Sequence, residues 1–274
     1  MAPLPLPTSL SPSRLASFTS CGLAFKLSAI DRLPEPASVW TAKGTLVHLA
    51  LERLHADLVP AARTPAAAAG LVREAVAEVL AAPECADLDL EDPEAFVADA
   101  EQLAANAFLL EDPTRVRAVG LELKLEATTP DGLVLRGVID RLDLRPDGSL
   151  VVVDYKTGAA PRLRHEAARL AGVHLYAYLV EQNLGVAPSS VELLHLREPL
   201  VLACASSERT RSSLQRRTSA AWAAIEQACA TDGFEPQPGP LCGLCAFRSL
   251  CPAWPAGPAE AGAGPQAEAV VAGL

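Results

Sequence analysis

Apolar residues recur at helical spacing through the first 110 residues of the chain, where alanine and leucine dominate. Ser11 and Pro12 predict a short helix that ends near Cys21, because serine caps free backbone amides and proline fits the first helical turn. Longer helices are predicted at residues 39–58, 66–81 and 93–109. We interpret residues 60–112, which hold the last two of these helices, as a helical insertion.

After Val116 the pattern changes to the alternation of apolar and polar residues that is typical of β-strands. Three such runs, separated by two Pro-Asp-Gly sequences, lie at residues 116–128, 133–144 and 149–158. Because Pro-Asp-Gly favours a tight turn, these runs predict an antiparallel meander. The predicted order ends with a helix at 165–184, strands at 191–198 and 199–205, and a helix at 207–230. This succession indicates an α/β fold.

Hydrophobic residues make up 50% of the 274-residue chain, which argues against wholesale disorder. No apolar stretch reaches the roughly 18 to 20 uncharged residues that a membrane-spanning helix needs. The N-terminal residues lack the basic start and apolar run of a signal peptide, so we expect a cytoplasmic protein that does not bind membranes. Residues 255–274 are rich in alanine, glycine and proline, which predicts a disordered tail.

The net charge of −10 does not by itself favour nucleic-acid binding, for which a basic surface is usual. Ten of the 33 acidic residues lie between 84 and 112, where there is no lysine or arginine, so the rest of the chain carries 23 acidic and 23 basic residues. Two basic clusters are candidates for phosphate contact or, equally, for solvated helix faces. They are Arg162, Arg164, His165 and Arg169, and then Arg209, Arg211, Arg216 and Arg217.

Acidic residues near the ends of two neighbouring predicted strands carry the candidate chemistry. Asp140 lies in the sequence GVIDR, and Asp154 begins DYKTG, in which Lys156 faces the same side of the strand as Asp154. Carboxylates bind divalent metal ions, and a metal ion beside an ammonium group is suited to phosphodiester hydrolysis. The D-x-K pattern alone also fits a surface turn with a lysine.

A histidine on the predicted helix 39–58 changes this picture. His48 lies in KGTLVHLALE, and a single histidine on a largely apolar helix is usually a core or boundary residue. Here, however, G-x-x-x-H-x-x-L-E, G-x-x-D-R-x-D and D-Y-K-T-G follow one another in this order. This succession resembles the RecB-like branch of the PD-(D/E)XK nuclease superfamily, over residues 9–252 as one domain.

The resemblance implies a PD-(D/E)XK nuclease core, a mixed sheet flanked by helices. It implies that catalytic Mg²⁺ or Mn²⁺ ions bind His48, Asp140 and Asp154. Lys156 would be the catalytic lysine, and the backbone carbonyl of Tyr155 would be a further metal ligand.

The family also has a Gln-x-x-x-Tyr motif in the following helix, which touches the DNA or the active site. If Tyr176 is the family tyrosine, Gly172 stands where glutamine is expected; if Tyr178 is, His174 stands there. This departure puts either full activity or the alignment in doubt. The two tyrosines could instead anchor the helix to the sheet.

Three of the seven cysteines form the sequence Cys242-x-x-Cys245-x5-Cys251. Such close spacing in a cytosolic chain favours a metal site over a disulfide. RecB-like exonucleases of the CRISPR-associated and AddB types place one cysteine before the nuclease core and three behind it. The resemblance therefore implies that Cys21 joins these three around a 4Fe-4S cluster, which would clamp residues 240–252 to the N-terminal segment. Four thiolates could also hold a structural zinc ion.

Together these features predict a metal-dependent DNA nuclease, and the resemblance implies an exonuclease of single strands acting in DNA repair or recombination. One alternative is a catalytically weak DNA-binding relative, which the missing glutamine favours. Another is a nuclease subunit that is active only beside a helicase. The chain has no G-x-x-x-x-G-K-S/T sequence, so ATP-driven unwinding would need such a partner.

Overall fold

Five strands form one sheet in the computed structural model, which describes residues 3–159 and 163–254 without the side chains of 163–173 and 241. The strands are β1 (Ala118–Thr128), β2 (Val134–Leu144), β3 (Leu150–Lys156), β4 (Ser190–His195) and β5 (Leu200–Ala205). Their order in the sheet is their order in the sequence. The β1–β2 and β2–β3 pairs are antiparallel, which confirms the predicted meander. The tail predicted at 255–274 lies outside the described residues.

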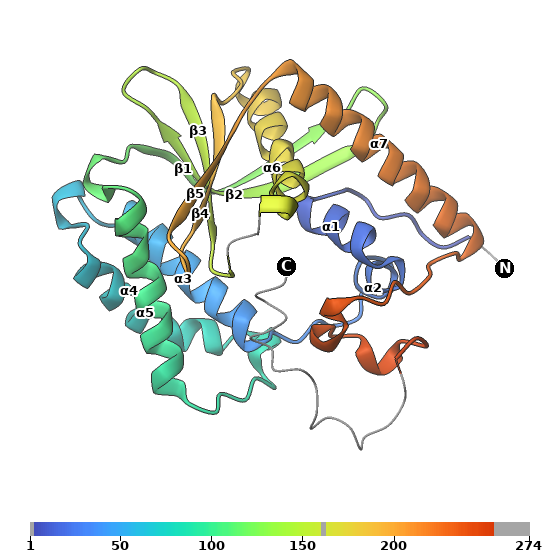
Figure 1. The fold of residues 1–274 in the computed structure, drawn as a ribbon, viewed down its shortest axis with the longest axis horizontal. Coiled ribbons are helices and arrows are strands. Elements are labelled where there is room, and N and C mark those ends of the chain that lie inside the picture. The colour runs from blue at the N-terminus through green and yellow to red at the C-terminus, as the bar shows by residue number, and fades with distance from the viewer. Residues whose placement is uncertain (1–2, 160–162, 255–274) are drawn as a thin grey trace.

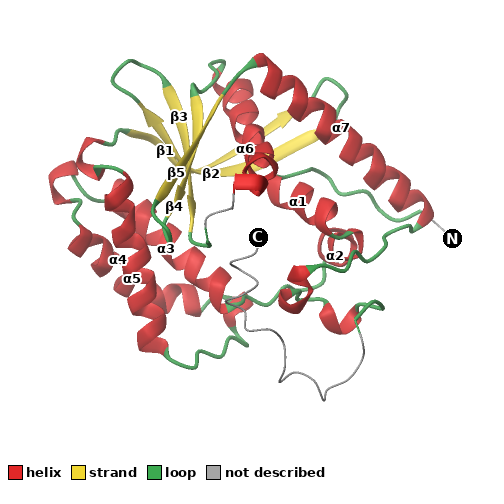
Figure 2. Cartoon of the chain, viewed as in Figure 1, coloured by secondary structure: helices red, strands yellow, loops and turns green. Residues whose placement is uncertain are grey.

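The next connection makes the sheet mixed, as predicted (Figure 2). Helix α6 (Leu163–Leu184) leads from β3 to β4, and these two strands run parallel. A parallel pair requires a crossover of this kind, because the chain must return to the end of the sheet from which it started. β5 then turns back and pairs with β4 in the antiparallel sense.

Helices cover both faces of this sheet (Figure 1). The others are α1 (Pro12–Ser20), α2 (Gly22–Phe25), α3 (Val39–Ala56), α4 (Pro65–Leu80), α5 (Pro93–Leu110) and α7 (Glu208–Thr231). α3, α4 and α5 share a core with Val151 and Val153 of β3. α1, α6 and α7 share the other core, which contains Val152, the β3 residue that lies between Val151 and Val153 in the sequence. No helix within the described ranges is long and apolar enough to span a membrane.

Local sequence signals explain where the long helices begin. Side chains of five cap residues accept a hydrogen bond from a backbone amide of the first turn: Ser11, Ser38, Thr64, Asp92 and Ser207. Proline follows the cap in α1, α4 and α5, where its fixed φ suits the first turn. The turns of the meander likewise depend on Gly132 and Gly148, which both have a φ of 85°.

Short elements between these helices were not predicted. A π-helix at Lys26–Ile30 continues α2, and short 3-10 turns lie at Pro60–Ala62, Pro83–Cys85, Pro113–Arg115, Pro240–Leu244 and Arg248–Leu250. Each of these segments is five residues or fewer, so no hydrophobic periodicity can develop along it.

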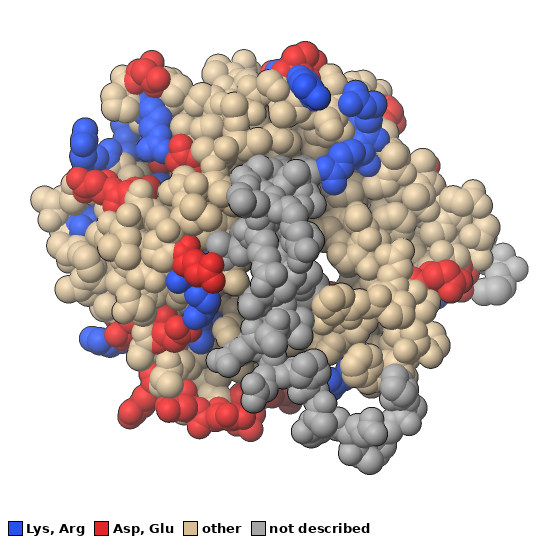
Figure 3. Space-filling model, in the orientation of Figure 1, with Lys and Arg blue, Asp and Glu red and all other residues tan. Residues whose placement is uncertain are grey.

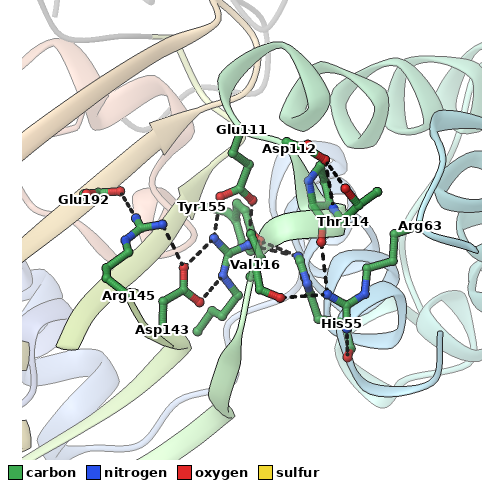
Figure 4. A network of polar contacts seen from close by, with 12 residues as sticks. His55, Arg63, Glu111, Asp112, Thr114, Val116, Asp143, Arg145, Tyr155 and Glu192 are labelled. Atoms are coloured by element: carbon green, nitrogen blue, oxygen red, sulfur yellow. Dashed lines mark hydrogen bonds and ion pairs between the residues drawn. The ribbon is translucent and has the colours of Figure 1, made fainter. Parts of the chain in front are cut away.

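A buried ion network joins the helical insertion to the sheet, and Figure 4 shows the residues around it. Arg141 of β2 is fully buried, and its guanidinium donates to the carboxylates of Glu111 and Asp143. It also contacts the Tyr155 hydroxyl and lies 2.9 Å from His55 Nε2. Burial and the nearby guanidinium groups lower the pKa of His55 to about 3, so this imidazole is neutral.

Arg141→Met is expected to lower the free energy of unfolding by about 3–5 kcal/mol, because it leaves the carboxylates of Glu111 and Asp143 in the interior without their cation. Urea denaturation measures this change. The matched control is Arg136→Met on the same strand, whose partner Glu126 is as exposed as Arg136 itself, at 52%. That variant should lose no more than about 1 kcal/mol. Equal losses in the two variants would contradict the role given to the buried network.

Candidate active site at the ends of β2 and β3

The ladder between β2 and β3 ends next to the two predicted acidic ligands. The last paired residues are Arg141 and Val153, so Asp140 and Asp154 occupy the next position on each strand. There the backbone N–H of Tyr155 donates to Asp140 Oδ2 at 2.7 Å instead of to a backbone carbonyl. The structure therefore brings both carboxylates to the point where the pairing of β2 and β3 ends, which we call the split between β2 and β3.

His48 reaches this split from α3. Its Nδ1 lies 3.4 Å from Asp140 Oδ2, and its ring meets that of Tyr155 edge-on, with centroids 6.0 Å apart. Gly44, one turn earlier, permits the close approach of the helix, since a Cβ at that position would lie 3.2 Å from Thr157 Oγ1. The three motifs that are separate in sequence thus meet at one place.

Glu122 of β1 completes a group that sequence reasoning missed. One ligand atom from each of His48, Glu122 and Asp140 lies within 4.8 Å of the other two, and the described part of the chain holds no second group of this kind. Glu122 has a φ of 42°, in the left-handed region that residues with a Cβ adopt at an energetic cost. Its carboxylate is therefore directed at the site by a strained backbone.

The negative charges at this site are only partly balanced. Burial raises the pKa of Glu122, and Asp140 raises it further, while His48 acts in the opposite direction. Burial also raises the pKa of Asp154, although Lys156 opposes it. For Asp140, burial raises the pKa, but His48, the N–H of Tyr155 and Lys156 together lower it below its usual range. Acidic groups that oppose one another's ionisation favour the binding of a cation.

Lys156 lies beside Asp154, as the D-x-K spacing predicted. Its Nζ contacts Asp154 Oδ2, and the two side chains differ in exposure, 42% for the lysine and 4% for the aspartate. The ammonium group therefore lies between a buried carboxylate and solvent. That is a position from which it can reach a substrate phosphate.

The donor set of this site fits a divalent ion such as Mg²⁺ or Mn²⁺. Carboxylate oxygens predominate, one imidazole nitrogen joins them, and no thiol belongs to the compact group. Hard cations prefer oxygen ligands, and Mn²⁺ also accepts imidazole.

A family model of the PD-(D/E)XK nuclease superfamily matches residues 9–252. The chain belongs to this superfamily. No curated protein matches the sequence. Among solved structures, a protein from Eubacterium rectale described as a "putative exonuclease" has a similar fold, with a TM-score of 0.53 and 13% identity over 94% of each chain. The structure of SSO0001 is also similar, with a TM-score of 0.36 and 14% identity over 89% of this chain and 96% of its own.

In this nuclease Tyr176, rather than Tyr178, is the tyrosine beside the predicted metal ligands. Burial raises the pKa of Tyr176, and the charges of Asp154 and Asp140 raise it further. The pKa of Tyr178 is raised by burial and by Asp131 and Glu181, which are not among the predicted site residues. This difference favours an alignment of the family motif on Tyr176.

The alignment on Tyr176 leaves Gly172 in the place of the family glutamine and frees His174 from that role. His174 Nε2 lies 3.5 Å from Cys204 Sγ, on the side of α6 that bears Tyr178. Gly137 of the GVIDR motif explains how Tyr176 comes so close to β2, since a Cβ there would lie 3.1 Å from the tyrosine Cε1.

The predicted arginine contacts to DNA are only partly visible in the nuclease. Arg162 lies outside the described residues, and so does the side chain of Arg164. Arg211 of α7 forms ion pairs with Glu181 and Glu208, each at 3.1 Å. On the face shown in Figure 3, basic and acidic side chains are interspersed, with acidic ones along the lower edge below α4 and α5.

Residues 235–237 of the nuclease lie against the N-terminal segment at Cys21. This residue lies between α1 and α2, where its Sγ accepts the Gln237 N–H at 3.4 Å, and Leu23 N–H donates to Glu235 O at 3.2 Å. Cys242 Sγ likewise accepts the Gly239 N–H at 3.2 Å. Cys21, Cys242, Cys245 and Cys251 are all partly exposed and free of disulfides. Amide hydrogens directed at sulfur favour the thiolate that binds metal.

Proposed function

We propose that this chain is a deoxyribonuclease of the RecB-like branch that digests single-stranded DNA from an end. The observation that carries the proposal is the gathering of His48, Glu122 and Asp140 next to the pair formed by Asp154 and Lys156. The order of the motifs supports the RecB-like branch. The same resemblance supports a role in DNA repair or recombination, and the N-terminal sequence supports a cytoplasmic location.

His48, Asp140 and Asp154 would hold Mg²⁺ or Mn²⁺, and Glu122 adds a carboxylate to this predicted set. The bound metal supplies an activated water and neutralises charge on the phosphate. Lys156 can orient the attacking water or stabilise the phosphate charge, because its ammonium group faces both Asp154 and solvent. The N–H of Tyr155 fixes Asp140, and its backbone carbonyl remains a predicted ligand.

We also propose that the four cysteines bind a 4Fe-4S cluster. Amide donors to two of the sulfurs and the contact of Leu23 with Glu235 support a ligand set assembled from both chain ends.

The proposed activity is tested with the purified protein and DNA labelled at either end, single-stranded or duplex, with and without Mn²⁺. We expect metal-dependent shortening of single strands from one end. Cuts distributed along the interior would contradict the exonuclease assignment. Binding without cleavage would favour the non-catalytic relative, and cleavage that appears only with a helicase would favour the dependent subunit.

A further inference from the structure

The indole of Trp40 is a large exposed aromatic group that the site described above does not use. It lies near the start of α3 and is 52% exposed. Trp40 precedes His48 by eight residues, which corresponds to about 12 Å along the helix axis. The two side chains are therefore separated by little more than two helical turns.

Two cations lie against this indole. Lys43 Nζ is 5.4 Å from the ring centroid, and Arg197 Cζ is 5.7 Å from it. Both groups bind the same oxygen of Asp99, at 2.7 Å for the lysine and 2.8 Å for the arginine. The two cations therefore approach the indole as a pair joined by Asp99, while Trp40 remains 52% exposed.

The same arginine ties the indole to the catalytic end of β3. Arg197 Nε donates to the backbone carbonyl of Thr157 at 3.3 Å, and Thr157 directly follows Lys156. Gly44 lies halfway along α3 between the indole and His48, against the Thr157 side chain. These contacts place the indole on the same side of α3 as Thr157 and the predicted ligand His48.

This surface has the chemistry of a binding site for single-stranded nucleic acid. Asp99 carries one negative charge against the two positive charges of Lys43 and Arg197, so one positive charge remains beside the ring. The Lys43 side chain is only 9% exposed, so Arg197, at 31%, is the cation that solvent reaches. Such a charge attracts backbone phosphate. An exposed aromatic face next to it can stack on any unpaired base, whatever the sequence.

We propose that Trp40 stacks on a base of the single-stranded DNA substrate, a few nucleotides from the phosphate that is cut, while the partly exposed Arg197 faces the DNA backbone. This inference rests on the proposed nuclease function and adds a binding position to it. We call the Trp40 indole with its two neighbouring cations the platform at Trp40. A DNA duplex cannot stack on this indole, because its bases are already stacked on one another.

The proposal is tested by binding measurements in an Asp154→Ala background, which prevents cleavage during the experiment. A set of oligodeoxynucleotides carries one abasic site each, moved one position at a time from the end. With Trp40 present, we expect one position at which the abasic site weakens binding about tenfold. Trp40→Ala should weaken binding of the intact oligonucleotide about tenfold and abolish the sensitivity at that position. Trp40→Phe should retain most of both.

Trp254→Ala is the matched control, since Trp254 is also partly exposed, at 39%, with Arg248 Cζ 5.7 Å from its ring centroid. It should leave the abasic-site profile unchanged. Unaltered affinity and profile in Trp40→Ala, with an unchanged melting temperature, would overturn the stacking role. If the parent protein shows the Trp40-dependent profile but wild type never cuts DNA, the nuclease function fails and the stacking site stands. Tighter binding of duplex than of single strands would also overturn the proposal.

Discussion

Asp154→Ala and Asp140→Ala are each expected to abolish metal-dependent cleavage of single-stranded DNA. Each substitution removes a carboxylate at the split between β2 and β3, where burial and the neighbouring acidic groups favour a bound cation. Losing a metal ligand costs several kcal/mol of transition-state stabilisation, which corresponds to about a thousandfold or more in rate. The fold and the affinity for DNA should change little, because no large side chain leaves the core. Initial rates of nucleotide release measure the effect.

The matched control for these variants is Asp147→Ala, in the exposed turn between β2 and β3. It removes a carboxylate from the same meander and should keep the rate of wild type. His48→Ala and Glu122→Gln should both lose activity. His48→Ala should keep a small part of the activity if water replaces the imidazole. Cleavage near the wild-type rate by either Asp154→Ala or Asp140→Ala would end the assignment of the active site.

Cys21→Ala is expected to lose the iron, to lower the melting temperature by roughly 5–10 °C and to expose both chain ends to protease. The reason is that three C-terminal thiolates cannot hold a stable cluster alone, although Cys21 precedes Cys242 by 221 positions. Other contacts between the two segments, such as the stacking of Phe25 on Phe234 with ring centroids 6.3 Å apart and the ion pair of Lys26 with Asp232 at 2.8 Å, keep the fold assembled, so the loss of stability is partial. Iron analysis, absorbance of anaerobic protein and limited proteolysis measure the loss.

The controls for the cluster are the three other cysteines, Cys85, Cys204 and Cys229. Their replacement by alanine should leave the iron content unchanged. Retention of iron and of melting temperature by Cys21→Ala, together with their loss in one of these three, would show that the quartet is wrong. One zinc per chain without visible absorbance would keep the clamp and exclude the iron-sulfur cluster.

The elements of the fold could be predicted because their signals are local. Cap residues, prolines and the two Pro-Asp-Gly turns fix where helices and strands start, and the structure has them within a few residues of the predicted bounds. The short turn at Lys26–Ile30 carries no such signal. It follows Phe25, which packs edge-on against Phe18 of α1 with ring centroids 5.2 Å apart, a tertiary contact that no local pattern expresses.

The candidate site was predictable only where its residues belong to short motifs. His48, Asp140, Asp154 and Lys156 stand in sequences that can be recognised singly and in order. Glu122 does not, because it alternates with apolar residues just as the exposed Lys124 and Glu126 do. Only its positive φ, and the place of β1 beside β2, distinguish it from a solvent-facing glutamate.

The platform at Trp40 was beyond sequence reasoning for a different reason. Its cations come from α3 and from the residues after β4, and they are held together by Asp99 of the helical insertion. Residues 157 positions apart along the chain, Trp40 and Arg197, become neighbours only through the tertiary fold. No spacing rule along the sequence could relate them.

The measurement that bears most directly on metal-dependent hydrolysis at this site is the release of nucleotides from end-labelled single-stranded DNA, as Mn²⁺ is titrated into metal-free protein. We expect no release without metal, a saturable rise as Mn²⁺ is added, and no rise in Asp154→Ala under the same conditions. Release at an undiminished rate in the presence of a chelator, or an equal rise in Asp154→Ala, would contradict hydrolysis by a metal ion held at the split between β2 and β3.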